Sequence, residues 1–137
     1  MILLGMGKVN YYACNKNVIT YCNLMALKQA EEIGISKALC EAYGNCILTL
    51  SIHKKNQLAE NFIDMGMFFS KQYSTTDSAP LANVLQMTGM YHSGVGNWDK
   101  AIEAFKQATE LGNNLGDCRL VEECTYFQST CLFLQGK

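Results

Sequence analysis

The feature that most constrains this chain is the spacing of its apolar residues, which recur every three or four positions in nearly every segment. Such spacing places side chains on one face of an α-helix, because the helix turns once in about 3.6 residues. The clearest stripe consists of Trp98, Ala101, Ile102, Phe105, Ala108 and Leu111. A second consists of Leu120, Cys124, Phe127, Cys131 and Leu134. No turn-bounded run alternates apolar and polar residues as a half-buried strand does, so the sequence predicts an all-α fold.

Short connections rich in Asn, Gly, Asp, Ser and Thr separate the stripes and divide the chain into about seven helices. They are expected at about 2–13, 17–33, 36–53, 57–72, 78–95, 98–113 and 117–135. Ser36, Asn97 and Asp117 stand where side-chain N-caps are preferred, and Asp99 lies in a first turn, where an acid interacts favourably with the helix dipole. The only proline, Pro80, falls at a helix start, where proline is tolerated.

Composition and charge narrow the classes of partner. With 137 residues, 49% of them hydrophobic, the chain suits one domain with a substantial core. Eleven Lys and Arg against twelve Asp and Glu give a net charge of −1 and no basic excess of the kind that nucleic-acid binders carry. The charged fraction of 17% is below the usual ~25%, which suggests that part of the surface is covered by a partner. No apolar run approaches the ~18 residues of a membrane span.

The seven cysteines do not form a disulfide framework in this interpretation. Their number is odd, no Cys-x-x-Cys pair occurs, and the start Met-Ile-Leu-Leu-Gly-Met-Gly-Lys lacks the features of a signal peptide. A reducing, cytoplasmic location is therefore expected, with the cysteines packed as small apolar side chains.

Internal repetition supports a helical hairpin as the unit of the fold. Residues 33–39 and 115–121 share the order apolar, Gly, any, small, basic, apolar, apolar, at an offset of 82 residues. Half of that offset, 41 residues, relates Asn56 to Asn97, each of which begins a helical stripe. The expected hairpins are about 2–33, 36–72 and 78–113, followed by an unpaired helix at 117–135.

Residues 88–108 resemble a tetratricopeptide repeat. The matching positions are Gly89 in the first helix, Gly96 and Trp98 around the turn, and Ala101, Phe105 and Ala108 in the second helix. The resemblance implies hairpins stacked as a right-handed solenoid, in which Gly89, Ala101 and Ala108 let helices approach and Phe105 fills the space between hairpins. The chain departs from the family at 113–116, where Asn-Asn-Leu-Gly replaces a helix-stopping proline and lengthens the repeat from about 34 residues.

The last fifty residues are also similar to the repeat regions that follow the ATPase module of large signalling proteins. Those proteins include soluble-type adenylyl and guanylyl cyclases, ATPase-coupled kinases and STAND regulators. The resemblance implies that 1–137 is one repeat region and a fragment of a longer array. The sequence itself contains no phosphate-binding Gly-x4-Gly-Lys-Ser/Thr loop. Uncovered end faces are then expected to promote self-association. The residues expected to be partly uncovered include Leu120, Cys124, Phe127 and Cys131.

The function expected from these patterns is a non-catalytic scaffold that binds a protein, a peptide or a neighbouring domain. In stacked hairpins the first helices line a concave face. The register of the best repeat predicts that this face carries Glu41, Leu48, Asn83, Gln86, Met90, Glu123, Tyr126 and Thr130. The simpler interpretation is that these are solvated helix positions without a ligand.

The alternative function is a small enzyme or a metal-binding domain that uses cysteine and histidine. His53 lies beside two lysines near a helix end, and His92 has no acid or nucleophile at a recognisable spacing. The sets Cys40, Cys46, His53 and Cys118, Cys124, Cys131 are spaced by six and seven residues. At 1.5 Å per residue such neighbours stand about 9–10 Å apart, too far to share one ion. We therefore expect no catalytic residue, metal or cofactor.

Overall fold

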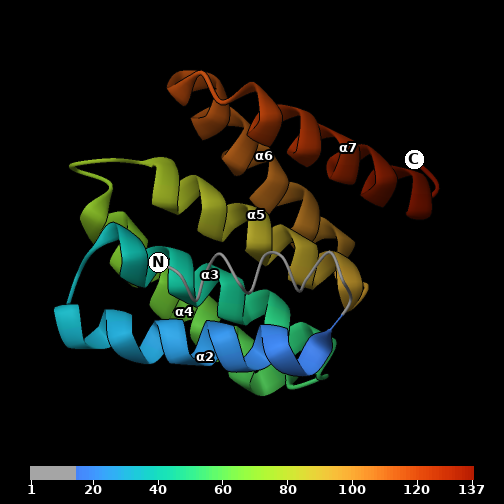
Figure 1. The fold of residues 1–137 in the computed structure, drawn as a ribbon. Helices are drawn as coiled ribbons and strands as arrows, with labels where there is room; N and C mark the ends of the chain where they lie inside the picture. The colour runs from blue at the N-terminus through green and yellow to red at the C-terminus, as the bar shows by residue number, and fades with distance from the viewer. Residues whose placement is uncertain (1–14) are drawn as a thin grey trace.

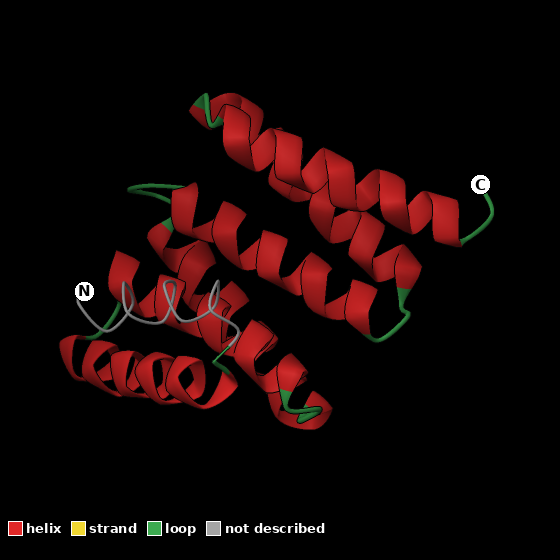
Figure 2. Cartoon of the chain, turned by 45° about the vertical axis from the view of Figure 1, so that its right-hand side comes forward, coloured by secondary structure: helices red, strands yellow, loops and turns green. Residues whose placement is uncertain are grey.

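The computed structural model describes residues 15–137, and within them it contains six α-helices and no strand (Figure 2). The helices are α2 (Lys16–Ile33), α3 (Lys37–Ile52), α4 (Asn56–Tyr73), α5 (Ala79–Gly94), α6 (Trp98–Leu115) and α7 (Cys118–Leu134). Each boundary lies within two residues of the one expected from the sequence, so the all-α prediction is confirmed. The helix expected at 2–13 lies outside the described residues.

Local capping explains several of these helix starts. The Ser36 hydroxyl accepts a hydrogen bond from the Leu39 amide at 3.2 Å, and the Asp117 carboxylate accepts one from the Leu120 amide at 3.0 Å. Such side chains satisfy amides that the first turn leaves without a partner. Asn97 occupies the N-cap of α6, but its side chain makes no capping bond, so its expected capping role is wrong.

The helices pack in chain order, from α2 to α7 (Figure 1). Each helix contacts the next one, and α3 also contacts α5, while α5 also contacts α7. The first helices of successive hairpins are therefore neighbours, and α3, α5 and α7 together form one side of the molecule. None of the helices in the described range is both long and apolar enough to cross a membrane.

Phe105 is the centre of the core formed by α5, α6 and α7. Its side chain is 0% exposed, as predicted, and its ring stacks on that of Phe127 with centroids 5.6 Å apart. Ala101 and Ala108, one turn to either side on α6, are also 0% exposed. Trp98 is partly buried against the same cluster. The pattern that suggested the repeat is thus the pattern that packs α6 against its neighbours.

The expectation of an uncovered apolar face on α7 is wrong for three of its four residues. Leu120, Cys124 and Cys131 are 6%, 0% and 1% exposed, because α7 packs this face on α6 and the core around Phe105. Only Phe127 is left half-buried. The apolar side chains that α7 does expose are Tyr126, Phe133 and Leu134.

The cysteines of the described range have free thiols, and five of the six are buried as expected. Cys118, at the start of α7, is exposed and departs from that expectation, while Cys14 lies outside the described residues. Burial raises the pKa of Cys46 to about 12 and that of Cys124 to about 11. These two thiols therefore stay protonated at neutral pH and act as apolar packing groups.

Candidate functional site

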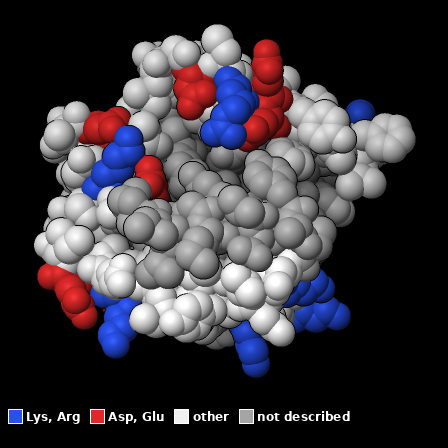
Figure 3. All heavy atoms as spheres, in the orientation of Figure 1, with Lys and Arg blue, Asp and Glu red and all other residues white. Residues whose placement is uncertain are grey.

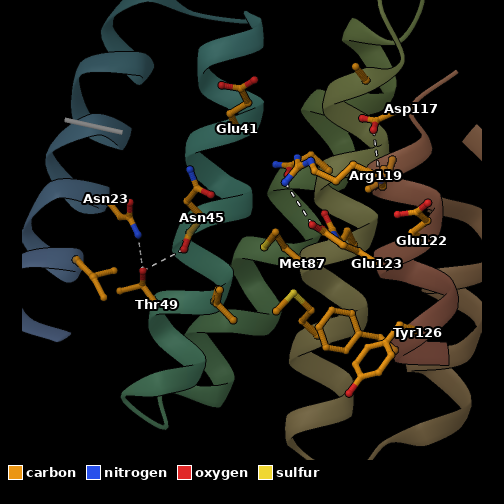
Figure 4. A pocket seen from close by; sticks show the side chains of 18 of the residues that line it. Asn23, Glu41, Asn45, Thr49, Met87, Asp117, Arg119, Glu122, Glu123 and Tyr126 are labelled. Carbon is orange, nitrogen blue, oxygen red and sulfur yellow. Dashed lines mark hydrogen bonds and ion pairs between the residues drawn. The ribbon is translucent and has the colours of Figure 1, made fainter. Parts of the chain in front are cut away.

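The main cavity among the described residues is a groove of about 750 Å³ across the side formed by α3, α5 and α7, with α2 at its edge (Figure 4). We call it the groove. Each of the three helices contributes side chains at steps of four and three residues, which lie on one helix face. These are Glu41, Asn45 and Leu48 on α3, then Asn83, Met87 and Met90 on α5, then Arg119, Glu123 and Tyr126 on α7.

Seven of the eight residues predicted for a concave face line the groove. They are Glu41, Leu48, Asn83, Gln86, Met90, Glu123 and Tyr126. Thr130 does not line it, and its hydroxyl instead donates a hydrogen bond to the Tyr126 carbonyl oxygen in its own helix. The structure therefore brings seven predicted positions from three helices into one cavity, whereas their binding of a partner stays a prediction.

Other residues that line the groove were not predicted, although the spacing along the helices indicated four of them. Asn45 and Met87 stand four residues after the predicted Glu41 and Asn83, so the next turn of the same face would have included them. Arg119 and Phe127 stand four residues before and four residues after the predicted Glu123, so the same spacing on α7 would have included them as well.

One end of the groove is polar and acidic. Among the described residues, four carboxylates line it, from Glu41, Asp117, Glu122 and Glu123, against the two cations of Lys37 and Arg119. Figure 4 shows Glu41 on α3 and Asp117 on α7 at this end. On this side of the molecule acidic and basic side chains lie next to one another (Figure 3).

Both cations at this end already have acidic partners. Lys37 Nζ lies 3.7 Å from Asp77 Oδ2, and Arg119 Nη1 lies 3.3 Å from Glu123 Oε1. The second carboxylate oxygen of Glu123 accepts a 2.7 Å hydrogen bond from Gln86 Nε2, which joins α7 to α5. The polar end is thus organised around carboxylates, with Glu123 held from two sides.

The other end of the groove is apolar. Leu48 and Ile52 from α3, Met90 from α5 and Phe127 from α7 line it, and each is half-buried. Tyr126 is 68% exposed, and its ring meets that of Phe127 edge-on at 5.5 Å. Methionine and aromatic side chains adapt to varied apolar ligands, so this end offers an apolar contact surface.

A buried polar pair holds the α2–α3 wall of the groove in place. The Asn23 amide donates a 2.7 Å hydrogen bond to the Thr49 hydroxyl, which donates in turn to the Asn45 carbonyl oxygen at 3.0 Å. Asn23 and Thr49 are 6% and 2% exposed. Buried polar groups are costly to separate from their partners, so this wall is formed before any ligand arrives.

Neither histidine belongs to the groove. His53 caps the C-terminus of α3, with its Nε2 atom 2.7 Å from the Thr20 hydroxyl oxygen. His92 is 5% exposed near the end of α5, and its Nδ1 atom has no hydrogen-bond partner among the residues that the structure describes. No group of three or more His, Cys, Asp or Glu side chains in residues 15–137 is arranged to hold a metal ion.

His92 is expected to make stability depend on pH. Burial lowers the pKa of its imidazole below the ordinary 6.5, while the nearby charges act in opposite directions, Glu60 raising it and Lys100 lowering it. The unfolded chain then binds a proton more readily than the folded one, so the free energy of unfolding should fall as the pH drops below about 6.5. Urea unfolding at about pH 7 and about pH 5.5 measures this loss. His92→Gln should reduce the loss, whereas a loss as large in His92→Gln as in the unmodified chain would contradict the assignment.

A scan against protein-family models and searches of curated proteins and of solved structures gave no match. The described residues therefore define the class of this protein by its fold and its groove. It is an all-helical protein with one preformed groove across three neighbouring helices.

Proposed function

We propose that this chain is a non-catalytic helical-repeat module whose groove binds a segment of another protein or of a neighbouring domain. The observation that carries the proposal is the shared lining of the groove. The same face of α3, α5 and α7 contributes side chains at the same four-and-three spacing, and these faces meet in one cavity. The groove combines a wall held by buried hydrogen bonds with half-buried apolar side chains whose exposed surface a ligand would cover.

The packing and size of the molecule support the proposal. Contacts of α3 with α5 and of α5 with α7 are those expected of hairpins stacked as a solenoid, whose first helices line a binding surface. A volume of about 750 Å³ falls within the ~300–1,000 Å³ that ligand sites occupy.

The resemblances found in the sequence extend the proposal to a wider setting. They favour a repeat region in a cytoplasmic signalling protein of the nucleotidyl cyclase or ATPase-coupled kinase type. In that setting the occupant of the groove is a segment of the same polypeptide, and binding is regulatory. The residues of the groove are the same for either occupant.

Selection of peptides from a random displayed library tests the proposal. The chain should enrich related sequences, and Met90→Arg, which places a charged side chain in the groove, should abolish their binding. Asn83→Ala and Met90→Ala should weaken binding several-fold without changing the far-UV circular dichroism, because both are half-buried side chains that line the groove. Binding is measured by fluorescence anisotropy.

The matched control is Met65→Arg. Met65 is 41% exposed on α4 and lies outside the groove, so the same substitution there should leave peptide binding unchanged. Enriched peptides that bind Met90→Arg as well as the unmodified chain would show that binding occurs elsewhere. A library that yields no related sequences would also contradict the proposal.

A further inference from the structure

We infer that the groove selects a short extended peptide with lysine or arginine at one end and large apolar side chains at the other. This inference rests on the proposed function and specifies the chemistry of its ligand. It follows from two properties that lie at opposite ends of one cavity.

Two carboxylates at the acidic end of the groove form no ion pair with another described residue. Asp77 and Glu123 are engaged by Lys37 and Arg119, and Asp117 caps α7, but Glu41 and Glu122 form no ion pair with another described residue. Glu41 stands on α3 and Glu122 on α7, and both line the groove, with Arg119 and Glu123 drawn between them (Figure 4). A cationic side chain bound at this end of the groove would be attracted by both carboxylates.

The helix N-termini at this end are the feature that most favours an anionic ligand. The groove is lined near the starts of α3, α5 and α7, and helix N-termini attract anions. Here, however, the Ser36 and Asp117 side chains already accept hydrogen bonds from first-turn amides of α3 and α7. An anionic ligand would also lie among four carboxylates and find both cations already paired. The local charge therefore favours a cation.

The apolar end requires a different kind of side chain. Leu48, Ile52 and Met90 are half-buried there and leave apolar surface open to solvent. Covering such surface contributes about 25 cal/mol per Å², whereas a charged side chain at this end would lose water without gaining a partner. Leucine, isoleucine, methionine or phenylalanine of a ligand fits this end.

The distance between the two ends sets the spacing within the ligand. Glu41 and Ile52 are eleven residues apart on α3, which corresponds to about 16 Å along the helix axis. An extended chain covers about 3.3 Å per residue. About five residues therefore connect the basic position to the last apolar position.

Defined peptides test the inference. The probes are labelled Lys-Lys-Ser-Ser-Leu-Ser-Phe and the same residues in reverse order, since the groove accepts one chain direction better than the other. Matched peptides carry Glu-Glu in place of Lys-Lys, or Ser in place of Leu and Phe. At low ionic strength one basic–apolar peptide should bind at least about tenfold more tightly than either matched peptide. The advantage over the Glu-Glu peptide should shrink as salt is added.

Reversing the protein charges completes the test. Two variants are used: Glu122→Lys, at an exposed position, and the double variant Glu41→Lys/Glu122→Lys. Both should bind the Lys-Lys peptide more weakly and the Glu-Glu peptide more tightly than the unmodified chain does. Glu32→Lys is the matched control, because Glu32 is exposed at the end of α2 outside the groove and should change neither affinity.

The outcomes separate this inference from the proposed function. Tighter binding of the Glu-Glu peptide to the unmodified chain would overturn the charge preference and leave the groove as a binding site. Failure of every defined peptide, while library-selected peptides still bind in a Met90-dependent way, would overturn the inference alone. Failure of both sets would overturn the proposed function as well.

Discussion

Replacing Phe105 with alanine is expected to lower the free energy of unfolding by about 3–5 kcal/mol, the usual range for a buried aromatic side chain. Phe105 is 0% exposed, and its ring lies between α5, where it contacts Gly89, and α7, where it stacks on Phe127 at 5.6 Å. Its removal leaves a cavity that three helices must close together. The cost therefore has two parts. Apolar burial is lost, and the cavity stays partly open because other residues hold the three helices in place.

Urea denaturation monitored by circular dichroism measures this effect. Phe133→Ala is the matched control, because the same substitution on α7 affects a ring that is 79% exposed and should cost less than about 0.5 kcal/mol. A loss below about 1 kcal/mol for Phe105→Ala would show that the core of α5, α6 and α7 is not organised around this ring.

Gly89→Ala should destabilise the chain by about 1–3 kcal/mol, the range for overpacking a well-filled core. A Cβ atom at Gly89 would stand 2.7 Å from Cε1, 2.8 Å from Cδ1 and 2.9 Å from Cζ of Phe105. Such distances are well inside van der Waals contact, and the ring has little room to retreat because Phe127 lies against it. The substitution would otherwise stabilise a helix, so a loss isolates the steric effect.

Gly94→Ala supplies the control in the same helix. Its Cβ would have only Ser51 Oγ nearby, at 3.8 Å, so the variant should be neutral or slightly more stable. A second test pairs Gly89→Ala with Phe105→Leu, whose smaller side chain leaves room for the methyl group. The cost of Gly89→Ala should be smaller in that background, by a coupling free energy of about 0.5 kcal/mol or more. Equal costs in both backgrounds would refute the contact.

Helix positions and the residues of the core stripe could be predicted from the sequence because both depend on short-range order. The spacing of Ala101, Phe105 and Ala108 defines one helix face, and an apolar face of that width must be buried. Ser36 and Asp117 form capping bonds with amides three residues away, so local sequence contains all the information that these caps need. Asn97 shows the limit, because the same residue type at the same kind of position makes no such bond.

The groove was partly predictable for the same reason. The repeated register indicated that Glu41, Asn83 and Glu123 occupy equivalent faces of three helices, and all three line one cavity. On α7 the register included Thr130, which does not line the cavity, and left out Arg119, which lines it one turn before Glu123. A repeat pattern gives the face of a helix but not the angle at which that helix lies on its neighbours.

The sequence by itself determined an all-α chain, the extent of its helices and the faces that those helices bury, since each depends on residues a few positions apart. Only the tertiary structure decided which end of the groove is acidic and which acids there form no ion pair within residues 15–137. The partners involved, Lys37 with Asp77 and Gln86 with Glu123, are separated by forty and thirty-seven residues. Electrostatic interactions depend on distance in space, and for these pairs that distance is fixed by how α3, α5 and α7 pack together.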